Sequence, residues 1–321
     1  MERRVIVLPS NADPATRNIP LRGKILATAA LTAVWTFLTL VAIIIEGGIL
    51  SFDENPMLGV SATTLISIGG LSRRIVVAGE WYRLFWSHML HAGLLHWLFN
   101  CVAWFPVGLI LEPDWGSFRL LWVYGASALT GNLLSATLDA HNVSVGASGG
   151  ILGCFSGLAV YILEFRRTIP FHKIWTGSVF FMILLTIATG FMPYVDNYAH
   201  LGGSAGGLLA SLSTLSTWGV KQWRTNPLPD VTKVQVFDVN SRACRLSLRK
   251  SHSPYDVDIF EKGYGIWLVR VVSFLLLTWG WGVMAYYLGY CDACYTPPGQ
   301  LYEIITSQLS GTSSSDEFLS R

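Results

Sequence analysis

The stretch Ser144–Gly157 reads SVGASGGILGCFSG and places Ser148 between glycines at the start of a long apolar run. Gly149, Gly153 and Gly157 recur every four residues, so on a helix they line one stripe. Small residues at this spacing let two membrane helices approach closely. A serine hydroxyl at the head of such a helix is a candidate nucleophile, but a plain packing motif explains the same residues.

The composition indicates a membrane protein. Of the 321 residues, 52% are hydrophobic and only 13% are charged, whereas a soluble domain carries about a quarter charged residues. A helix needs about 20 apolar residues to cross a bilayer. Seven long stretches contain no Asp, Glu, Lys or Arg, namely 25–45, 84–111, 120–138, 141–163, 174–195, 197–220 and 271–291. We therefore expect an all-α membrane protein with a six-helix core and one additional C-terminal transmembrane helix.

The distribution of charge predicts the orientation, because cytosolic flanks of membrane spans are rich in Lys and Arg. The tail before the first span is basic, and so are the connections between spans four and five and between spans six and seven. The tail after Cys291 is mainly acidic. The N-terminus is therefore expected in the cytosol and the C-terminus outside or in a lumen. No basic stripe suggests a nucleic-acid partner.

These patterns divide the chain into five segments. They are a cytosolic N-terminal tail (1–24), the six-helix core (25–218), a cytosolic linker (219–263), the seventh transmembrane helix (264–291) and an external, disordered tail (292–321). The first external loop, 46–83, is long and partly apolar, so it is expected to lie against the bilayer or to cover a site. Cys291 and Cys294 fit a disulfide, a reducible pair or no pair at all.

Polar side chains inside apolar spans are costly and call for a reason. The second stretch contains His88, His91, His96 and Asn100, the fourth contains Ser148 and the sixth contains His200. All three stretches run from outside to inside, and His96, Ser148 and His200 lie near their external ends. The three side chains are therefore expected to meet in one pocket that opens to external water.

A serine and a histidine that meet in such a pocket have the chemistry of a nucleophile and its general base. The developing oxyanion needs hydrogen-bond donors, and the available ones are His96, the Asn100 amide and the backbone N–H of Ser148. Gly149, Gly153 and Gly157 would bring this helix against the helix that carries His200, which has glycines of its own at 203 and 207.

Other interpretations fit parts of this pattern. A lone serine in a glycine-rich membrane helix is usually a packing residue, and a lone interfacial histidine is usually hydrogen-bonded rather than a base. His88, His91 and His96 are conceivable metal ligands, but no carboxylate accompanies them. Gly146–Gly150 also satisfies the Gly-x-Ser-x-Gly nucleophile elbow, which requires a strand of a soluble sheet before it. Here the flanking runs are of bilayer length, so the soluble hydrolase is excluded by context.

Taken together, these residues resemble the rhomboid family of intramembrane serine proteases, over about residues 25 to 218. The family's Gly-x-Ser-Gly box matches Gly146–Gly149, which implies that Ser148 is the nucleophile. Its Ala-His-x-x-Gly-x-x-x-Gly box matches Ala199–Gly207, which implies that His200 is the base of a two-residue dyad.

The resemblance also assigns roles around this dyad. It implies that His96 and Asn100 stabilise the oxyanion, and that the remaining matched residues support the site structurally: His91, Gly146, Gly149, Gly203 and Gly207. Weaker matches are Arg83, preceded here by Tyr82 in place of Trp, and Gly108 with Glu112. The extra C-terminal helix resembles the secretase-type 6+1 layout rather than the mitochondrial 1+6 layout, which favours the secretory pathway or plasma membrane.

The chain departs from the family pattern at two positions near the site. Leu152 stands where some members stack Tyr or Phe on the catalytic histidine, and Gly150 replaces a common Ala. Neither change removes a group that the dyad needs. Asp196, four residues before His200, is interpreted as a helix cap and not as a third catalytic residue.

The expected function is therefore a serine endopeptidase that cleaves single-pass membrane proteins near the outer end of their transmembrane helix, without metal or cofactor. Its partners would be such substrates and the lipid bilayer. The alternative is a catalytically silent rhomboid-like protein that binds membrane clients for trafficking or degradation. That alternative is disfavoured because both Ser148 and His200 are present. A transporter would show paired broken helices, and the sequence has no such symmetry.

Overall fold

The computed structural model describes residues 25–139, 143–164, 172–189, 195–215 and 263–289, and within these ranges it contains helices but no strands. The expected all-α membrane fold is therefore confirmed. The short elements are α4 (Ala62–Ser67), α5 (Arg73–Val77), α6 (Arg83–Trp86) and the 3-10 turn η2 (Ser87–Met89). The long helices are α3 (Leu26–Glu46), α7 (Leu94–Leu138), α8 (Ser148–Glu164), α9 (His172–Thr189), α10 (Asn197–Ser213) and α13 (Gly263–Gly289).

Helix α7 consists of two helices joined at Gly116. The backbone of Gly116 has φ 77° and ψ 157°, which interrupts the helix and is a conformation that favours glycine. The parts on either side, 94–115 and 117–138, overlap the second and third apolar stretches of the sequence, 84–111 and 120–138. Helix α7 thus provides two of the helical segments that the charge-free runs predict.

Three of the described helical segments are long and apolar enough to cross a bilayer on their own: Leu26–Glu46, Leu94–Pro113 and Ile266–Gly289. Shorter apolar stretches occur at Ser148–Leu163 in α8 and at Lys173–Leu184 in α9. The protein is therefore a membrane protein with several apolar helices. The full count of seven spans stays a prediction.

The start of the second span differs from the sequence prediction. Residues 84–93 are not part of a long helix, because they form α6, η2 and a short extended segment before α7 begins at Leu94. His88 and His91 therefore lie before the helix, so the prediction that they are inside the second transmembrane span is wrong. The reason is a pairing with a distant segment of the chain: Leu94 and Leu95 donate their N–H groups to the carbonyl oxygens of Leu58 and Met57 at 3.0 and 3.1 Å. An apolar run without charges does not reveal such a contact.

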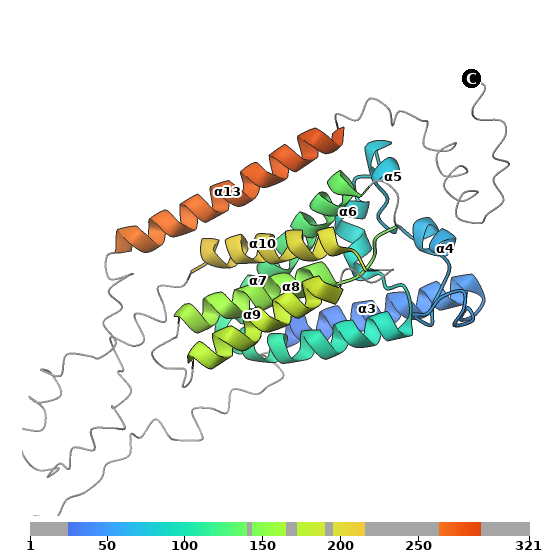
Figure 1. Ribbon diagram of the computed structural model, residues 1–321, viewed down its shortest axis with the longest axis horizontal. Coiled ribbons are helices and arrows are strands. Elements are labelled where there is room, and N and C mark those ends of the chain that lie inside the picture. The colour runs from blue at the N-terminus through green and yellow to red at the C-terminus, as the bar shows by residue number, and fades with distance from the viewer. Residues whose placement is uncertain (1–24, 140–142, 165–171, 190–194, 216–262, 290–321) are drawn as a thin grey trace, which may run out of the picture.

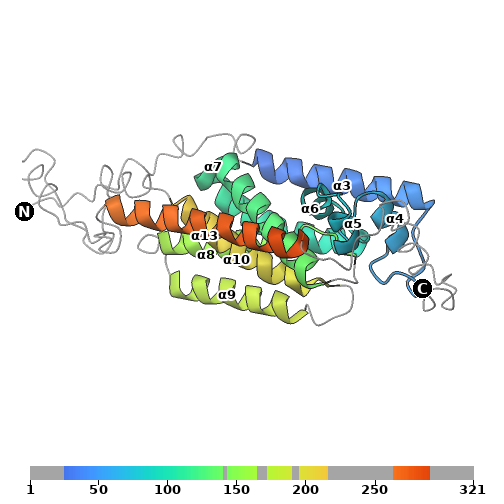
Figure 2. The same cartoon turned by 90° about the horizontal axis from the view of Figure 1, so that it is seen from above.

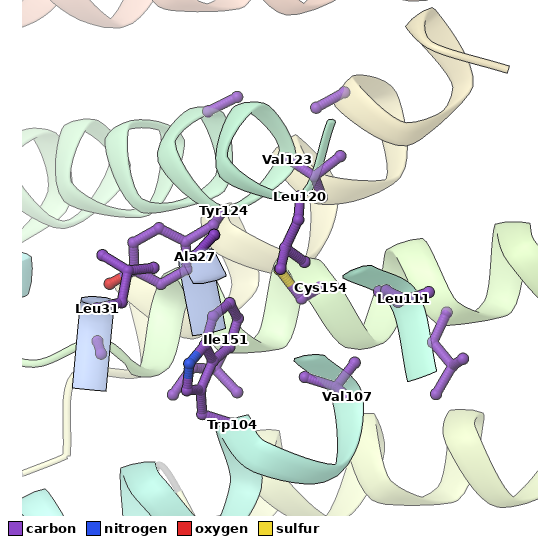
Figure 3. Close-up of a cluster of buried hydrophobic side chains, with 14 of the residues drawn as sticks. Ala27, Leu31, Trp104, Val107, Leu111, Leu120, Val123, Tyr124, Ile151 and Cys154 are labelled. Atoms are coloured by element: carbon purple, nitrogen blue, oxygen red, sulfur yellow. The ribbon is translucent and has the colours of Figure 1, made fainter. Parts of the chain in front are cut away.

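Helix α10 lies at the centre of the bundle. It packs on α7 and α8, and α13 runs along its outer side in both views (Figures 1 and 2). Helix α9 packs mainly on α8. The core between α3, α7 and α8 is filled by large apolar side chains, among them Trp104, Tyr124 and Ile151 (Figure 3). Such packing fixes the position of α8, the helix that begins at Ser148, against α3 and α7.

Glu112 holds the first helix against α7. Its Oε1 accepts hydrogen bonds from the Ala27 amide at 2.7 Å and the Ser117 hydroxyl at 2.6 Å. Its Oε2 accepts from the Thr28 amide at 2.9 Å and the Thr28 hydroxyl at 2.6 Å. The first amides of a helix have no partner within the helix, so a carboxylate is well suited to this place. A Cβ at Gly108 would lie 2.5 Å from the Thr28 hydroxyl, so Gly108 serves the same contact.

Arg83 ties the loop before α7 together. Its side chain is buried, and Nη1 donates to the carbonyl oxygens of Ile66 and Gly70, each at 2.7 Å. Nε and Nη2 reach Glu80 at 2.8 and 2.7 Å. Earlier in this loop, Leu71 exchanges two backbone hydrogen bonds of 2.9 Å with Ser144. The loop is thereby joined to the stretch that leads into α8.

Candidate active site

Ser148 is the first residue of α8 and follows a tight backbone turn. Gly146 has φ 129°, a backbone conformation that residues with a Cβ rarely adopt. Its N–H donates to the Ser87 carbonyl oxygen at 3.2 Å. The first intrahelical bond runs from the Ile151 N–H to the Ala147 carbonyl at 3.0 Å. Ser148 is therefore held at a helix N-terminus, where backbone amides are left without intrahelical partners and favour negative charge.

His200 reaches Ser148 from α10. Its Nε2 lies 2.8 Å from the Ser148 Oγ, and the histidine is only 5% exposed. The two residues are 52 positions apart in the sequence, so only the packing of α8 on α10 brings them together. A hydroxyl within hydrogen-bond distance of an imidazole nitrogen is the arrangement of an activated nucleophile and its base.

Asp196 is the N-cap of α10. Its Oδ1 accepts the Ala199 N–H at 2.9 Å, and its Oδ2 accepts the Ser135 hydroxyl at 2.5 Å. Both carboxylate oxygens are thus engaged by groups other than the His200 ring. This geometry agrees with the interpretation of Asp196 as a helix cap.

Glycines make the approach of α8 and α10 possible. A Cβ at Gly149 would lie 3.0 Å from the Ala199 carbonyl oxygen, and one at Gly153 would lie 2.8 Å from that of Gly203. A Cβ at Gly203 would overlap the backbone of Gly149, and one at Gly207 would overlap the backbone of Gly153. The two helices touch through their backbones just below Ser148 and His200, which is the close approach that the glycine spacing predicts. Gly157 continues this contact, because a Cβ there would lie 2.8 Å from the Ser211 hydroxyl oxygen of α10 and equally close to the Trp115 ring.

The second half of α7 also packs closely on α10, and the sequence did not lead us to expect this contact. A Cβ at Gly131 would lie 2.5 Å from the Ala199 carbonyl oxygen, and one at Gly202 would lie 2.8 Å from that of Thr130. A Cβ at Gly206 would overlap the Thr130 side chain. The signal was available, since Gly202 and Gly206 form a second stripe four residues apart on α10.

His96 lies over the turn that precedes Ser148. A Cβ at Gly146 would lie 2.6 and 2.8 Å from Cε1 and Nε2 of the His96 ring. The Ala92 N–H donates to His96 Nδ1 at 3.4 Å. With Nδ1 as an acceptor, the neutral ring carries its proton on Nε2, a tautomer assigned from the hydrogen bond. His96 therefore offers an N–H donor beside the Ser148 turn.

Asn100 is placed differently from His96. It is 5% exposed, and its Nδ2 donates to the His96 carbonyl oxygen at 2.9 Å, one turn earlier in the same helix. The hydrogen bond that the structure gives this amide is therefore local and not directed to Ser148. The amide nitrogen has two N–H donors and this bond uses one of them, so a contribution of Asn100 to the oxyanion stays a prediction.

His91 is packed among aromatic rings. It is 1% exposed, with its ring centroid 5.8 Å from that of Trp35 and 5.3 Å from that of His96, both edge-on. In the described part of the chain, no group of three or more His, Cys, Asp or Glu side chains is arranged to hold a metal ion. His91 thus contributes to packing beneath His96. Cys291 and Cys294 lie outside the described residues.

Comparison with known proteins identifies the region that contains these residues. Residues 78–217 match the Rhomboid domain. RHOMBOID-like protein 1 of Arabidopsis thaliana is 36% identical over 178 residues, which are 54% of this chain and 46% of that protein. RHOMBOID-like protein 6, mitochondrial, of the same plant is 38% identical over 152 residues, 47% of this chain and 49% of its own length.

A bacterial relative carries the word protease in its name. Rhomboid protease GluP of Bacillus subtilis is 34% identical over 149 residues, which are 46% of this chain and 29% of that protein. This chain spans about half or less of the length of these relatives. The matched domain includes both Ser148 and His200.

Proposed function

This chain belongs to the rhomboid family through its domain at residues 78–217, and from that premise we propose that it is an intramembrane serine endopeptidase. In this proposal Ser148 is the nucleophile and His200 the general base. The observation that supports it most directly is the 2.8 Å contact between the Ser148 Oγ and the His200 Nε2. The contact is buried, and it lies where glycines let α8 and α10 approach each other closely.

The first half of the reaction forms an acyl-enzyme. His200 Nε2 takes the hydroxyl proton as the Ser148 Oγ attacks the carbonyl carbon of the scissile bond. The resulting oxyanion accepts hydrogen bonds from the Ser148 N–H at the helix start and from the His96 Nε2–H. His200 then gives its proton to the leaving amine, and the C–N bond breaks.

The second half regenerates the enzyme. A water molecule from the external side loses a proton to His200 and attacks the acyl carbon. Collapse of this second tetrahedral species releases the new carboxyl end, and His200 returns the proton to Ser148. The side chains present are sufficient for each proton transfer.

The substrate that suits this site is a single-pass membrane protein. Ser148 is at the end of α8 that joins the loop containing Leu71, so a cut near the outer end of a transmembrane helix is expected. A helix hides its carbonyl groups in hydrogen bonds, so the cleaved segment must unwind first. Small or helix-breaking residues near the cut would lower the cost of unwinding.

The test is a comparison of the purified protein with Ser148→Ala and His200→Ala. A fluorophosphonate should label the wild type and neither variant, and only the wild type should cleave members of a panel of single-pass substrates in vesicles. Cleavage that persists in Ser148→Ala would rule out the mechanism. A wild type that binds such proteins but is neither labelled nor active would support the alternative, a rhomboid-like protein that binds membrane clients without cleaving them.

A further inference from the structure

His88 and Tyr124 form a buried polar pair that the proposed mechanism does not use. The Tyr124 hydroxyl lies 3.1 Å from His88 Nδ1 and 3.5 Å from the His88 carbonyl oxygen. The two rings meet edge-on with centroids 5.4 Å apart. Tyr124 is 2% exposed and His88 is 8% exposed. A hydroxyl kept in a hydrocarbon core is costly unless it is bonded, so the pair calls for a reason.

Tyr124 touches the helix of the nucleophile directly. A Cβ at Gly150 would lie 2.5 Å from Cε2 and 3.0 Å from Cζ of the Tyr124 ring. Gly150 is in the first turn of α8, two residues after Ser148. The ring thus packs on the backbone of that turn, at a distance that is possible because Gly150 has no side chain.

His88 acts on the other side of Ser148. It lies in η2, and the carbonyl oxygen of its neighbour Ser87 accepts the Gly146 N–H at 3.2 Å. Gly146 is two residues before Ser148. The Ser87 hydroxyl in turn accepts from Asn132 Nδ2 at 3.1 Å, which anchors η2 to the second half of α7. Tyr124 therefore contacts the chain after the nucleophile, at Gly150, and His88 is bonded to that ring from η2, whose Ser87 binds the chain before the nucleophile, at Gly146.

The Tyr124 ring is itself firmly held. Its centroid is 5.9 Å from that of Trp35 on α3. It is 5.5 Å from the centroid of Trp104 on the first half of α7, and Figure 3 shows these two rings. Closely packed interiors transmit displacement instead of absorbing it. A change in the bond between Tyr124 and His88 should therefore move the turn that carries Ser148.

We propose that Tyr124 and His88 are positioning residues that fix the turn of Ser148 relative to His200. The inference rests on the proposed function, because it concerns the geometry of that dyad. Without the hydroxyl, the hydrogen bond that links η2 to the ring packed on the first turn of α8 is lost. The Ser148 Oγ is then no longer held at its distance from His200 Nε2. A misplacement of about 1 Å at a reacting group can lower a rate by about 100-fold.

The first experiment compares wild type and Tyr124→Phe. The rate constant of fluorophosphonate labelling at Ser148 and the kcat for a transmembrane substrate should both fall about tenfold, as a partial misplacement predicts. KM should stay within about twofold, because no substrate contact is removed. His88→Leu should behave in the same way, and His88→Asn should recover much of the rate because its amide occupies the place of Nδ1.

The double variant Tyr124→Phe with His88→Leu distinguishes positioning from loss of stability. It should label no more slowly than either single variant, since both changes break one interaction. Ser213→Ala is the matched control, because it removes another buried hydroxyl bond, 2.7 Å to the Ala210 carbonyl, at the far end of α10. It should label at the wild-type rate, whatever its effect on the melting temperature.

The possible outcomes separate the two proposals. If the wild type is labelled, Ser148→Ala is not, and Tyr124→Phe and His88→Leu are labelled at the wild-type rate, then the positioning role is refuted while the proposed function stands. If each single variant slows labelling and the double variant slows it by the product of the two effects, the two residues do not act as a pair. A wild type that is not labelled refutes the proposed function and the positioning role with it.

Discussion

At the scale of single residues, Gly146 combines two constraints that a larger residue cannot meet. Its φ of 129° is disfavoured for any residue with a Cβ, and a Cβ would also strike the His96 ring. The first constraint concerns stability and the second concerns the candidate oxyanion donor. The two can be separated, because Gly79 has φ 117° but open space where its Cβ would lie.

Gly146→Ala is predicted to reduce the rate of fluorophosphonate labelling by about 100-fold, the lower end of the loss expected when one oxyanion donor is removed. Gly79→Ala pays only the backbone strain of about 1–3 kcal/mol and should lower the melting temperature with little effect on the labelling rate per folded molecule. Equal labelling of the two variants would contradict the role of the Gly146–His96 contact.

Asp196 permits a test of the number of catalytic residues. Asn is as good an N-cap as Asp, so Asp196→Asn should retain activity within a few-fold of the wild type. Asp196→Ala should lose about 1 kcal/mol of stability, the usual value of a cap. A triad aspartate replaced by Asn lowers kcat by about 10⁴, so a loss of that size in a cleavage assay would show that Asp196 works with His200.

At the scale of elements, the site depends on the contact between α8 and α10. Gly203 is at its centre, where even a Cβ would overlap the Gly149 backbone. The helices cannot stay at this distance with larger residues between them, and Ser148 then moves away from His200. The sequence predicted this pair of stripes from spacing alone, but not the second half of α7, whose residues touch the neighbouring stripe of α10 at Gly202 and Gly206.

Gly203→Val is predicted to abolish labelling and to destabilise the fold by about 1–3 kcal/mol, the usual cost of overpacking. Gly125→Ala is the matched control, because Gly125 lies in α7 with nothing near its Cβ position. That variant should label like the wild type and melt at the same temperature or slightly higher. Retention of labelling in Gly203→Val would mean that the close approach is not needed.

At the scale of the whole molecule, orientation in the bilayer is still a prediction from charge. The basic segments that support it, including 1–24 and most of the linker 219–263, lie outside the described residues. Single cysteines at Ser10 and Ser313, in a background with the native cysteines replaced, can be treated with a membrane-impermeant maleimide on intact cells. The label should reach position 313 but reach position 10 only after permeabilisation. Labelling of position 10 in intact cells would reverse the orientation.

The sequence by itself determined the class of the protein, the glycine stripes and the identity of the candidate dyad, because apolar length and residue spacing are local properties of a chain. It did not determine where the second span begins, since Leu94 and Leu95 bond to residues almost forty positions earlier. It also did not show that Asn100 bonds within its own helix, or that His88 is bonded to Tyr124, which packs on Gly150. Only the tertiary structure decided these points, because each depends on which backbone and side-chain groups distant segments bring within hydrogen-bond reach.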